Sequence, residues 1–263
     1  YTPVYDVEES RWKEIGSHIN STIRISGEEK ITDAFVLRSF ATNAYMISVT
    51  KNGLVKKTAV REYEVSRNNK TMSNMKLLDG DAVVKTMVAY AYDEILIASK
   101  NGFVSRYPVS LIPETSPRSK GVKAMNLVLD EIVSACISHG DASQLIVFTD
   151  QCQMKRIKLS DVDVTGRPTK GSMICKKVKS KPYQIAHIAL HDLNDELVII
   201  NEETQKILAK DISLMSKDAT FSSPLHTTQD YYFLRTLAAV EQRELPAIQE
   251  EKQEFEEIEL FED

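Results

Sequence analysis

The chain has 263 residues, of which 42% are hydrophobic, and a formal net charge of −5. This is enough apolar material for a globular core, but no apolar run approaches the roughly 18 residues of a membrane-spanning helix, so we expect no membrane insertion. Three cysteines without CxxC spacing exclude a disulfide framework or a zinc knuckle, and we expect buried free thiols in a reducing cytoplasm. We interpret the chain, which starts at Tyr1 without a signal peptide, as part of a longer protein.

Four apolar runs that end in turns recur at nearly constant spacing. They are AYMISV, EILIAS, QLIVFT and ELVIIN, and taking Thr50, Ser99, Thr149 and Asn201 as equivalent gives steps of 49, 50 and 52 residues. Asn-Gly follows the first two runs and predicts a type I′ hairpin turn. The runs after the turns, LVKKTAV, FVSRYPV, QMKRIKL and QKILAKDI, alternate with period two, which indicates half-buried strands.

A polar loop and a further pair of strands around an acidic turn complete each unit, as in NMKLLDGDAVVKTMV and MNLVLDEIVSACI. Four strands in about fifty residues are typical of a propeller blade, which needs neighbours to bury its faces. We therefore expect an all-β, propeller-like fold of about five four-stranded blades, or six in the full protein, in a ring that is closed, open or broken. The expected units are residues 1–49, 50–98, 99–148, 149–205 and 206–236.

The charge is divided between a basic body and an acidic tail. Residues 51–181 contain 22 basic and 13 acidic side chains, a net +9, whereas residues 237–263 contain ten acidic and two basic side chains, a net −8. We expect the tail to be solvated and disordered.

Basic residues recur in the polar loop that follows the second strand of each unit. The loops are ESRWKEIG, VSRNNKTM, SPRSKGVK and TGRPTKGS. Aligned on their arginines, they each carry an arginine and, two or three residues later, a lysine, which gives the cationic pairs Arg11/Lys13, Arg67/Lys70, Arg118/Lys120 and Arg167/Lys170. Equivalent loops of a ring lie on a circle, so these loops predict a curved row of positive charge. Such a row suits bent duplex DNA, whose phosphates can be contacted without reading base sequence. The candidate DNA-binding residues are Arg11, Lys13, Lys56, Lys57, Arg67, Lys70, Arg106, Arg118, Lys120, Lys123, Arg156, Arg167, Lys170, Lys176 and Lys177.

Three segments that hint at other chemistry do not support it. GRPTKGS (166–172) lacks the Lys-Ser or Lys-Thr that follows the second glycine of a phosphate loop. HIALH (187–191) offers two histidines without an evident third metal ligand, and SHGDAS (138–143) crowds a serine, a histidine and an aspartate into one turn. We expect no catalytic residue, no metal and no cofactor in this chain.

TKNGLVKKTAV (50–60) and SKNGFVSRYPVSLIPETSPRSKGVKAMNLV (99–128) resemble the repeat of a known family. The family is the C-terminal domain of the A subunit of bacterial type IIA topoisomerases, a β-pinwheel, and the resemblance covers residues 1–236. The chain has no clean copy of the gyrase box Gln-Arg-Arg-Gly-Gly-Lys-Gly; SPRSKG and GRPTKG come nearest. This favours the A subunit of topoisomerase IV (ParC). Gyrase remains the alternative, because its box sits in the first blade, which would lie largely before Tyr1.

The resemblance implies a non-catalytic domain that binds and bends duplex DNA along a basic outer perimeter. It implies that the domain positions the transported DNA segment for decatenation and relaxation by a parent enzyme that uses ATP and Mg through other domains. The implied partners are duplex DNA, the rest of the A subunit, and the B subunit (ParE) in a heterotetramer. The implied location is the bacterial cytoplasm, at the nucleoid, and it allows peripheral membrane association.

Two alternatives remain open from the residues alone. The first is a protein-interaction propeller whose lysines only keep it soluble. The second concerns the acidic tail, which could lie over the basic loops as an intramolecular mimic of DNA instead of being free in solution.

Overall fold

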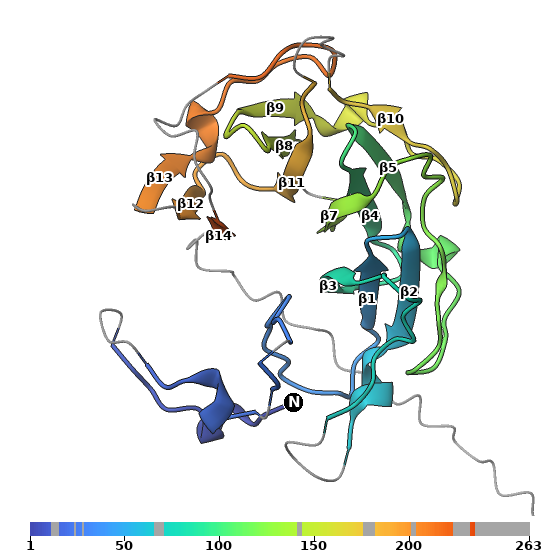
Figure 1. Cartoon of the computed structure of the whole chain (residues 1–263), viewed down its shortest axis with the longest axis vertical. Coiled ribbons are helices and arrows are strands. Elements are labelled where there is room, and N and C mark those ends of the chain that lie inside the picture. Colours follow the sequence, from blue (N-terminus) through green and yellow to red (C-terminus); the bar gives the residue numbers. More distant parts are fainter. Residues whose placement is uncertain are drawn as a thin grey trace, which may run out of the picture.

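The structure, a computed structural model, describes residues 1–11, 16–23, 25–27, 29–65, 71–140, 144–175, 182–200, 204–222 and 232–234. Four antiparallel sheets stand side by side along an arc around a central opening (Figure 1). The all-β, propeller-like prediction is confirmed, and the described residues form no closed ring.

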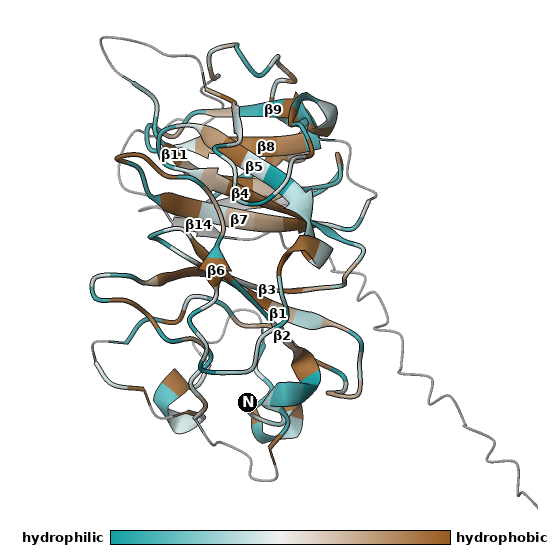
Figure 2. Ribbon diagram, turned by 90° about the vertical axis from the view of Figure 1, so that its right-hand side faces the viewer, coloured by the Kyte–Doolittle hydropathy of each residue, from teal (hydrophilic) through white to brown (hydrophobic). Residues whose placement is uncertain are grey.

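Each sheet is built on one hairpin from the repeated sequence. The hairpins are β1 (Tyr45–Thr50) with β2 (Leu54–Ala59), β4 (Glu94–Ser99) with β5 (Phe103–Pro108), β8 (Gln144–Thr149) with β9 (Met154–Lys158), and β12 (Glu196–Ile200) with β13 (Thr204–Leu208). First strands of the hairpins such as β4 and β8 are mostly hydrophobic, whereas β9 contains several hydrophilic residues (Figure 2).

The hairpin turns differ from the expected type. A type I′ turn needs positive φ at both central residues, but only the glycines, Gly53 (φ 93°) and Gly102 (φ 96°), have it. The amide of Gly53 donates to the carbonyl of Thr50 at 3.1 Å, which fits a three-residue loop ending in a left-handed residue. In the third hairpin Cys152 (φ 55°) occupies the glycine position, so the loop shape is kept without Asn-Gly.

An inner strand completes each sheet on the side of the central opening. These strands are β3 (Val83–Ala89), β7 (Ile132–Ser138), β11 (Ile185–Leu190) and β14 (Tyr232–Leu234), which pair with β1, β4, β8 and β12.

The outer edge of a sheet is supplied by the following unit. β6 (Val122–Lys123) comes after β5 in the chain but pairs with β2, and β10 (Ser172–Met173) comes after β9 but pairs with β5. Likewise Ser222, beyond β13, bridges to Met154 on β9. We call the exchanged segments the first outer band (112–123), the second outer band (162–173) and the third outer band (212–222). Each blade is therefore tied to the next by backbone hydrogen bonds.

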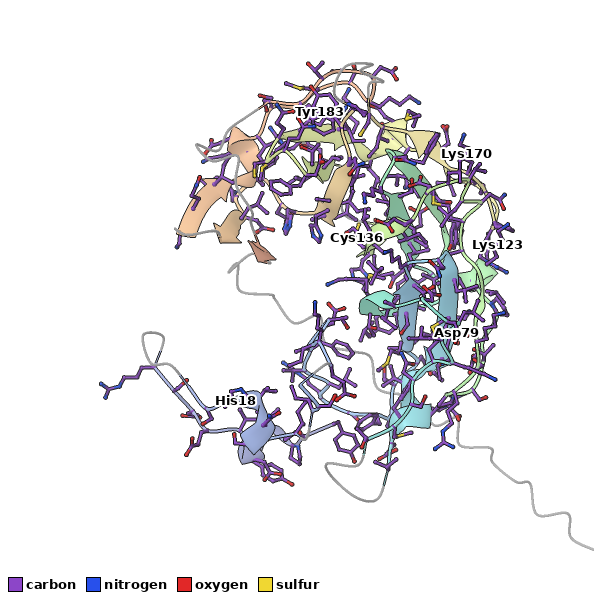
Figure 3. All side chains as sticks on the ribbon, in the orientation of Figure 1. His18, Asp79, Lys123, Cys136, Lys170 and Tyr183 are labelled. Atoms are coloured by element: carbon purple, nitrogen blue, oxygen red, sulfur yellow. The ribbon has the colours of Figure 1, made fainter. Side chains whose placement is uncertain are left out.

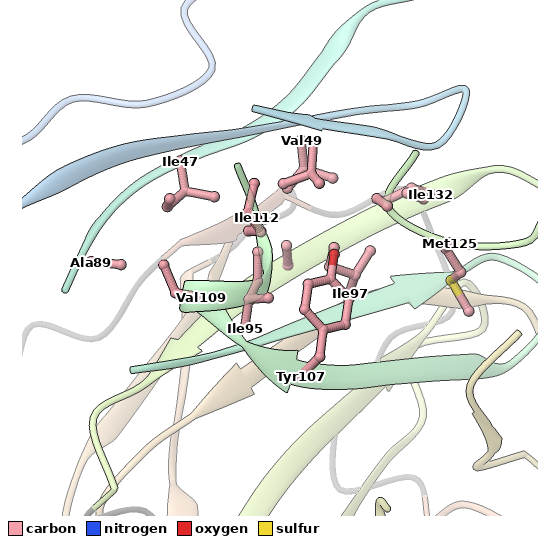
Figure 4. Packing of buried hydrophobic residues seen from close by; sticks show 13 residues of the cluster. Ile47, Val49, Ala89, Ile95, Ile97, Tyr107, Val109, Ile112, Met125 and Ile132 are labelled. Atoms are coloured by element: carbon pink, nitrogen blue, oxygen red, sulfur yellow. The ribbon is translucent and has the colours of Figure 1, made fainter. Parts of the chain in front are cut away.

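The core lies between blades. Ile47 and Val49 of β1 face Ile95, Ile97 and Tyr107 of the second sheet, and all five are fully buried (Figure 4). Similar clusters join the second sheet to the third and the third to the fourth. The second hairpin strands were expected to be half-buried, but β2 is buried on both faces from Val55 to Ala59, with Val55 in the core shared with the second sheet and Lys56 against Tyr63.

The expected number of blades is not reached in the described residues, which form four sheets. Residues 1–43 contain two short 3-10 turns and no named strand among those described. This N-terminal segment contacts the first blade through Asp33, whose carboxylate pairs with Lys85 and accepts from the amide of Thr86 at 2.7 Å. The acidic tail, 237–263, lies outside the described residues. In the part of the chain that the structure describes, no helix is long and apolar enough to cross a membrane.

Candidate nucleic-acid interface

Exposed cations gather on the first and second outer bands. Arg118, Lys120 and Lys123 are exposed on the first band, and Lys170 is exposed on the second. Lys123 and Lys170 lie on the outer side of the arc, away from the central opening (Figure 3). The side chains of Arg118, Lys120 and Lys123 form no hydrogen bond or ion pair with another described residue. These four residues, which we call the outer cations, are available to bind an anion.

The backbone of the bands fixes where the outer cations stand. Arg118 has a left-handed backbone (φ 68°), and its amide donates to the carbonyl of Asn74 at 3.1 Å. Beside Lys170, Gly171 (φ 80°) passes so close to β5 that an added Cβ would lie 2.3 Å from the carbonyl oxygen of Val104. The Lys170 ammonium sits 4.3 Å from the centre of the Phe103 ring, a cation–π contact that leaves its charge at the surface.

Arg167, the predicted partner of Lys170, is partly buried and has a structural bond to make. Its guanidinium donates to the carbonyl oxygens of Leu111 at 3.2 Å and Lys123 at 2.6 Å, so it ties the second band to the first. Lys217 makes the equivalent bond to the carbonyl of Asp161, at 3.3 Å, one unit later. Arg167 thus joins neighbouring bands, as Lys217 does one unit later, and we retain Arg167 only as a neighbour of the outer cations.

Lys56 and Lys57 are corrected by the structure, since neither side chain reaches the surface. Lys56 is 1% exposed and donates to Thr58 and Tyr63, and burial lowers its pKa to about 8. Lys57 is 6% exposed and donates to the carbonyl of Val109 at 3.4 Å; burial lowers its pKa as well, against the opposing effect of Glu114. Period-two alternation placed one of them on a solvent face, but Lys56 packs against Tyr63 and Lys57 against Val109 of the following unit.

Arg106 and Arg156 are also corrected, because their guanidinium groups bond inside the protein. Arg106 pairs with Glu94 and donates to the carbonyls of Leu159 and Val162, where the second band begins. Arg156 donates to Gln144 and to the carbonyls at the start of the third band. Both side chains are partly buried, and their donors are engaged. We remove all four corrected residues from the interface.

The remaining candidates are not brought to the bands by the described structure. Arg11 is exposed in the N-terminal segment, which lies apart from the three outer bands (Figure 1). The others lie outside the described residues and stay predictions: Lys13, Arg67, Lys70, Lys176 and Lys177.

The structural repeat shifts the alignment that the sequence suggested. The amides of Thr115 and Thr165 bind equivalent carbonyls on β2 and β5, which makes positions fifty residues apart equivalent. Arg118 therefore corresponds to Pro168 and not to Arg167, while Lys120 does correspond to Lys170. The constant spacing from the hairpins was the signal that could have found this register.

The third outer band does not continue the row of free cations. At the positions of Lys120 and Lys170 it has Thr220, and at the position of Arg118 it has Asp218. Its cation, Lys217, is the one bonded to Asp161. Among the described bands, the first therefore carries the most exposed positive charge. The described residues of the third band include no positively charged side chain that is free of an internal hydrogen bond.

The lysines at the first two hairpin turns are paired with one shared carboxylate, so we do not count them among the outer cations. Lys51 and Lys100 lie 2.9 Å and 3.0 Å from the carboxylate of Glu131, and their hydrogen bonds lower its pKa. Among the described residues no cluster of histidine, cysteine, aspartate or glutamate could hold a metal ion, and the three cysteines are free thiols.

The fold and the outer cations together define a propeller with exchanged outer strands and a basic perimeter. A family model described as "DNA gyrase C-terminal domain, beta-propeller" matches residues 1–38, 44–89, 93–139 and 143–192. The chain belongs to this family, which confirms the resemblance found in the repeats. The first three matched hairpin units begin just before β1, β4 and β8.

The most similar curated relatives include the same subunit of one enzyme in two organisms. The chain is 26% identical over 232 residues to the A subunit of DNA topoisomerase 4 from Staphylococcus epidermidis, and 28% identical over 206 residues to that from Bacillus subtilis. These matches cover 88% and 78% of this chain but only 29% and 25% of the relatives. The chain thus spans less than a third of the length of the subunits it resembles.

Solved structures agree with this placement. The C-terminal domain of DNA topoisomerase IV matches with a TM-score of 0.78 and 28% identity, over 85% of this chain and 70% of that one. The DNA gyrase A C-terminal domain matches with a TM-score of 0.73 at 17% identity, over 88% of this chain and 75% of that one, which shows the shared fold alone. Family and relatives together support a DNA-binding role.

Proposed function

We propose that this chain binds duplex DNA along its outer bands, largely without regard to sequence, and holds it in a bend. The observation that carries the proposal is the set of exposed outer cations, Arg118, Lys120, Lys123 and Lys170, of which Lys123 and Lys170 lie on the convex side of the arc (Figure 3). Four phosphate contacts would give a slope of log affinity against log salt of about −3.6, or a loss of about 10² in affinity from 50 to 200 mM salt. Phosphate contacts of this kind position DNA but carry no base code.

The curvature of the perimeter supports bending. Bending a short duplex costs on the order of 1–6 kcal/mol, and contacts on successive bands can offset that cost. A straight duplex would touch a convex arc at one place only, so simultaneous contact with Lys123 and Lys170 favours a curved path.

At the level of a parent enzyme, we propose that the chain is the C-terminal part of the A subunit of a topoisomerase IV. There it would position the transported DNA segment for decatenation and relaxation, with ATP and Mg bound by other domains and the B subunit (ParE) as partner. We place that enzyme in the bacterial cytoplasm, at the nucleoid, with peripheral membrane association allowed. A topology assay of the parent protein tests this: introduced negative supercoils would point instead to a gyrase.

A matched pair of double variants tests DNA binding by the chain itself. Lys120→Gln with Lys170→Gln removes two outer cations, and Lys51→Gln with Lys100→Gln removes two turn lysines that are paired with Glu131. Both variants have the same net charge. We expect the first to lower affinity for a 30-base-pair duplex about tenfold and to reduce the salt slope by about two, and the second to change affinity less than about twofold.

Equal losses in the two variants would mean that binding follows net charge and not the outer bands. No binding by the unmodified chain would favour a protein-interaction propeller.

A further inference from the structure

The second strand of each of the first three hairpins carries a cation that donates hydrogen bonds to backbone carbonyls of the next unit, a contact that we call the grip. Arg106 on β5 donates from Nη1 to the carbonyl oxygens of Leu159 at 2.9 Å and Val162 at 3.3 Å. Those carbonyls belong to the 3-10 turn Leu159–Asp161 and the residue after it, where the second outer band begins. The backbone carbonyl of Arg106 also accepts from the amide of Thr165, at 2.8 Å. Arg106 therefore holds the start of the band with both its side chain and its backbone.

A second residue orients each gripping cation from the first strand of the same hairpin. Glu94 accepts from Arg106 Nε at 2.7 Å, and Gln144 accepts from Arg156 Nη1 at 2.6 Å. In the first hairpin the equivalent contact is the face of the Tyr45 ring, 4.9 Å from the Lys57 ammonium. A carboxylate, an amide and an aromatic ring thus each orient the cation of the second strand from the equivalent position on the first strand.

The grip is two-pronged where the cation is arginine. Arg156 donates to the carbonyl of Ile212, the counterpart of Val162, at 2.6 Å and to that of Lys210 at 3.1 Å. Lys57, with a single ammonium, reaches one carbonyl, that of Val109, at 3.4 Å. The planar guanidinium can hold two carbonyls and its orienting residue at once, which an ammonium on a flexible stem does less well.

We propose that Arg106 is a positioning residue for DNA binding: by fixing the start of the second outer band it sets where Lys170 stands. The proposal rests on the proposed function. It assigns to Arg106 a role without DNA contact, because its donors are engaged by Glu94, Leu159 and Val162. The basic strand residues that look like DNA ligands in the sequence act instead on the band that carries the true contact.

Arg106→Lys tests this role, because it keeps the positive charge and removes the two-pronged grip. A residue that contacts phosphate directly would tolerate lysine. For a positioning residue we expect hydrogen exchange at the amides of 164–172 to quicken about tenfold, and DNA affinity to fall about fivefold at unchanged net charge.

Arg156→Lys is the matched control one blade further on. It should quicken exchange in 214–222 by a similar factor but leave DNA affinity within about twofold, since the third band has Asp218 and Thr220 where the outer cations would be. If Arg106→Lys proves poorly folded by circular dichroism, Glu94→Ala removes the side chain that orients the same guanidinium. We then expect smaller changes in the same directions.

Wild-type affinity in Arg106→Lys, or equal affinity losses in the two arginine variants, would overturn the proposal. Unchanged exchange in 164–172 would overturn it as well, since Arg106 would then not fix the band. If the unmodified chain binds no DNA, the proposed function fails and the positioning role fails with it. The exchange comparison then still decides whether the grip exists.

Discussion

The guanidinium of Arg167 donates to the carbonyl oxygen of Leu111 at 3.2 Å. This bond connects the second outer band to the residue that immediately precedes the first outer band. The next unit makes the equivalent bond with a lysine, from Lys217 to Asp161 at 3.3 Å. A residue that looks like half of a DNA-binding pair is therefore a connector between blades, and the repeat shows which substitution it tolerates.

We predict that Arg167→Lys lowers the free energy of unfolding by less than about 1 kcal/mol, because lysine fills this position one unit later and keeps one of the two carbonyl bonds. Arg167→Ala should lower the free energy of unfolding by about 1–2 kcal/mol, since the carbonyls of Leu111 and Lys123 lose a charged donor at a partly exposed site. Urea unfolding followed by circular dichroism measures both. A large loss in the lysine variant would contradict the equivalence with Lys217.

Two substitutions on the third band should extend the DNA-binding surface. Asp218→Lys with Thr220→Lys supplies cations where this band has none unengaged, so we expect tighter duplex binding and a salt slope steeper by about one to two. The control is Asp192→Lys with Asn194→Lys, which changes net charge equally at exposed positions in the loop between β11 and β12. Equal gains from both pairs would show that position on the perimeter does not matter.

Glycine is required at one left-handed position by contact and at another only by backbone conformation. Gly171 (φ 80°) would place a Cβ 2.3 Å from the carbonyl of Val104, whereas Gly80 (φ 74°) has nothing within 4 Å. Gly80→Ala should cost about 1 kcal/mol and Gly171→Ala more than about 3 kcal/mol, because the second band must then separate from β5. Denaturant midpoints of the two variants measure the difference. Equal costs would mean that the band gives way easily.

Acid should weaken the seam between the second and third blades. His187 on β11 lies 3.1 Å from the Ser134 hydroxyl of β7, and burial, assisted by Lys85 and His191, lowers its pKa to about 3. The unfolded chain binds a proton at His187 below pH 6.5, the ordinary value, while the folded chain does not. The contribution of neutral His187 to stability is therefore fully present above pH 6.5. Below that pH the free energy of unfolding falls by about 1.4 kcal/mol per pH unit, down to about pH 3.

The matched variant for this prediction is His187→Asn, which keeps a polar side chain near Ser134 but cannot titrate. We expect its melting temperature to fall less between pH 7 and pH 4 than that of the unmodified chain. Parallel curves would assign the acid sensitivity to other groups.

The repeated hairpins could be predicted because their signals are local. Alternating apolar residues and Asn-Gly lie within a dozen residues of each other, and the structure places β1, β2, β4 and β5 where those signals are. The turn type was wrong, because Gly53 alone supplies the positive φ. The local sequence is a reliable guide to where a hairpin loop forms, but a less reliable guide to the backbone conformation of that loop.

The fifty-residue period of the sequence does not show that strands of one unit pair with the unit before it. This is why several of the candidate DNA-binding residues were predicted wrongly. A following unit that packs on the preceding hairpin turns an apparent surface strand into a buried one, so Lys57 and Arg106 changed from ligands to internal donors, while Lys56 is buried against Tyr63. Lys120 and Lys170 share a position fifty residues apart, but aligning the loops on their arginines did not bring these two lysines together.

The exchange of outer strands also constrains how a protein of this kind can gain or lose units by duplication and deletion. One repeat contains the hairpin of its own blade and the outer strand that pairs with the hairpin of the preceding blade. Deleting one repeat at its hairpin boundaries therefore exposes the edge of β2 or β5 in the preceding blade, although that blade itself is intact. An added repeat survives only if its band fits the preceding hairpin and its hairpin fits the following band. Selection therefore acts on junctions between copies, and adjacent repeats are expected to diverge in pairs.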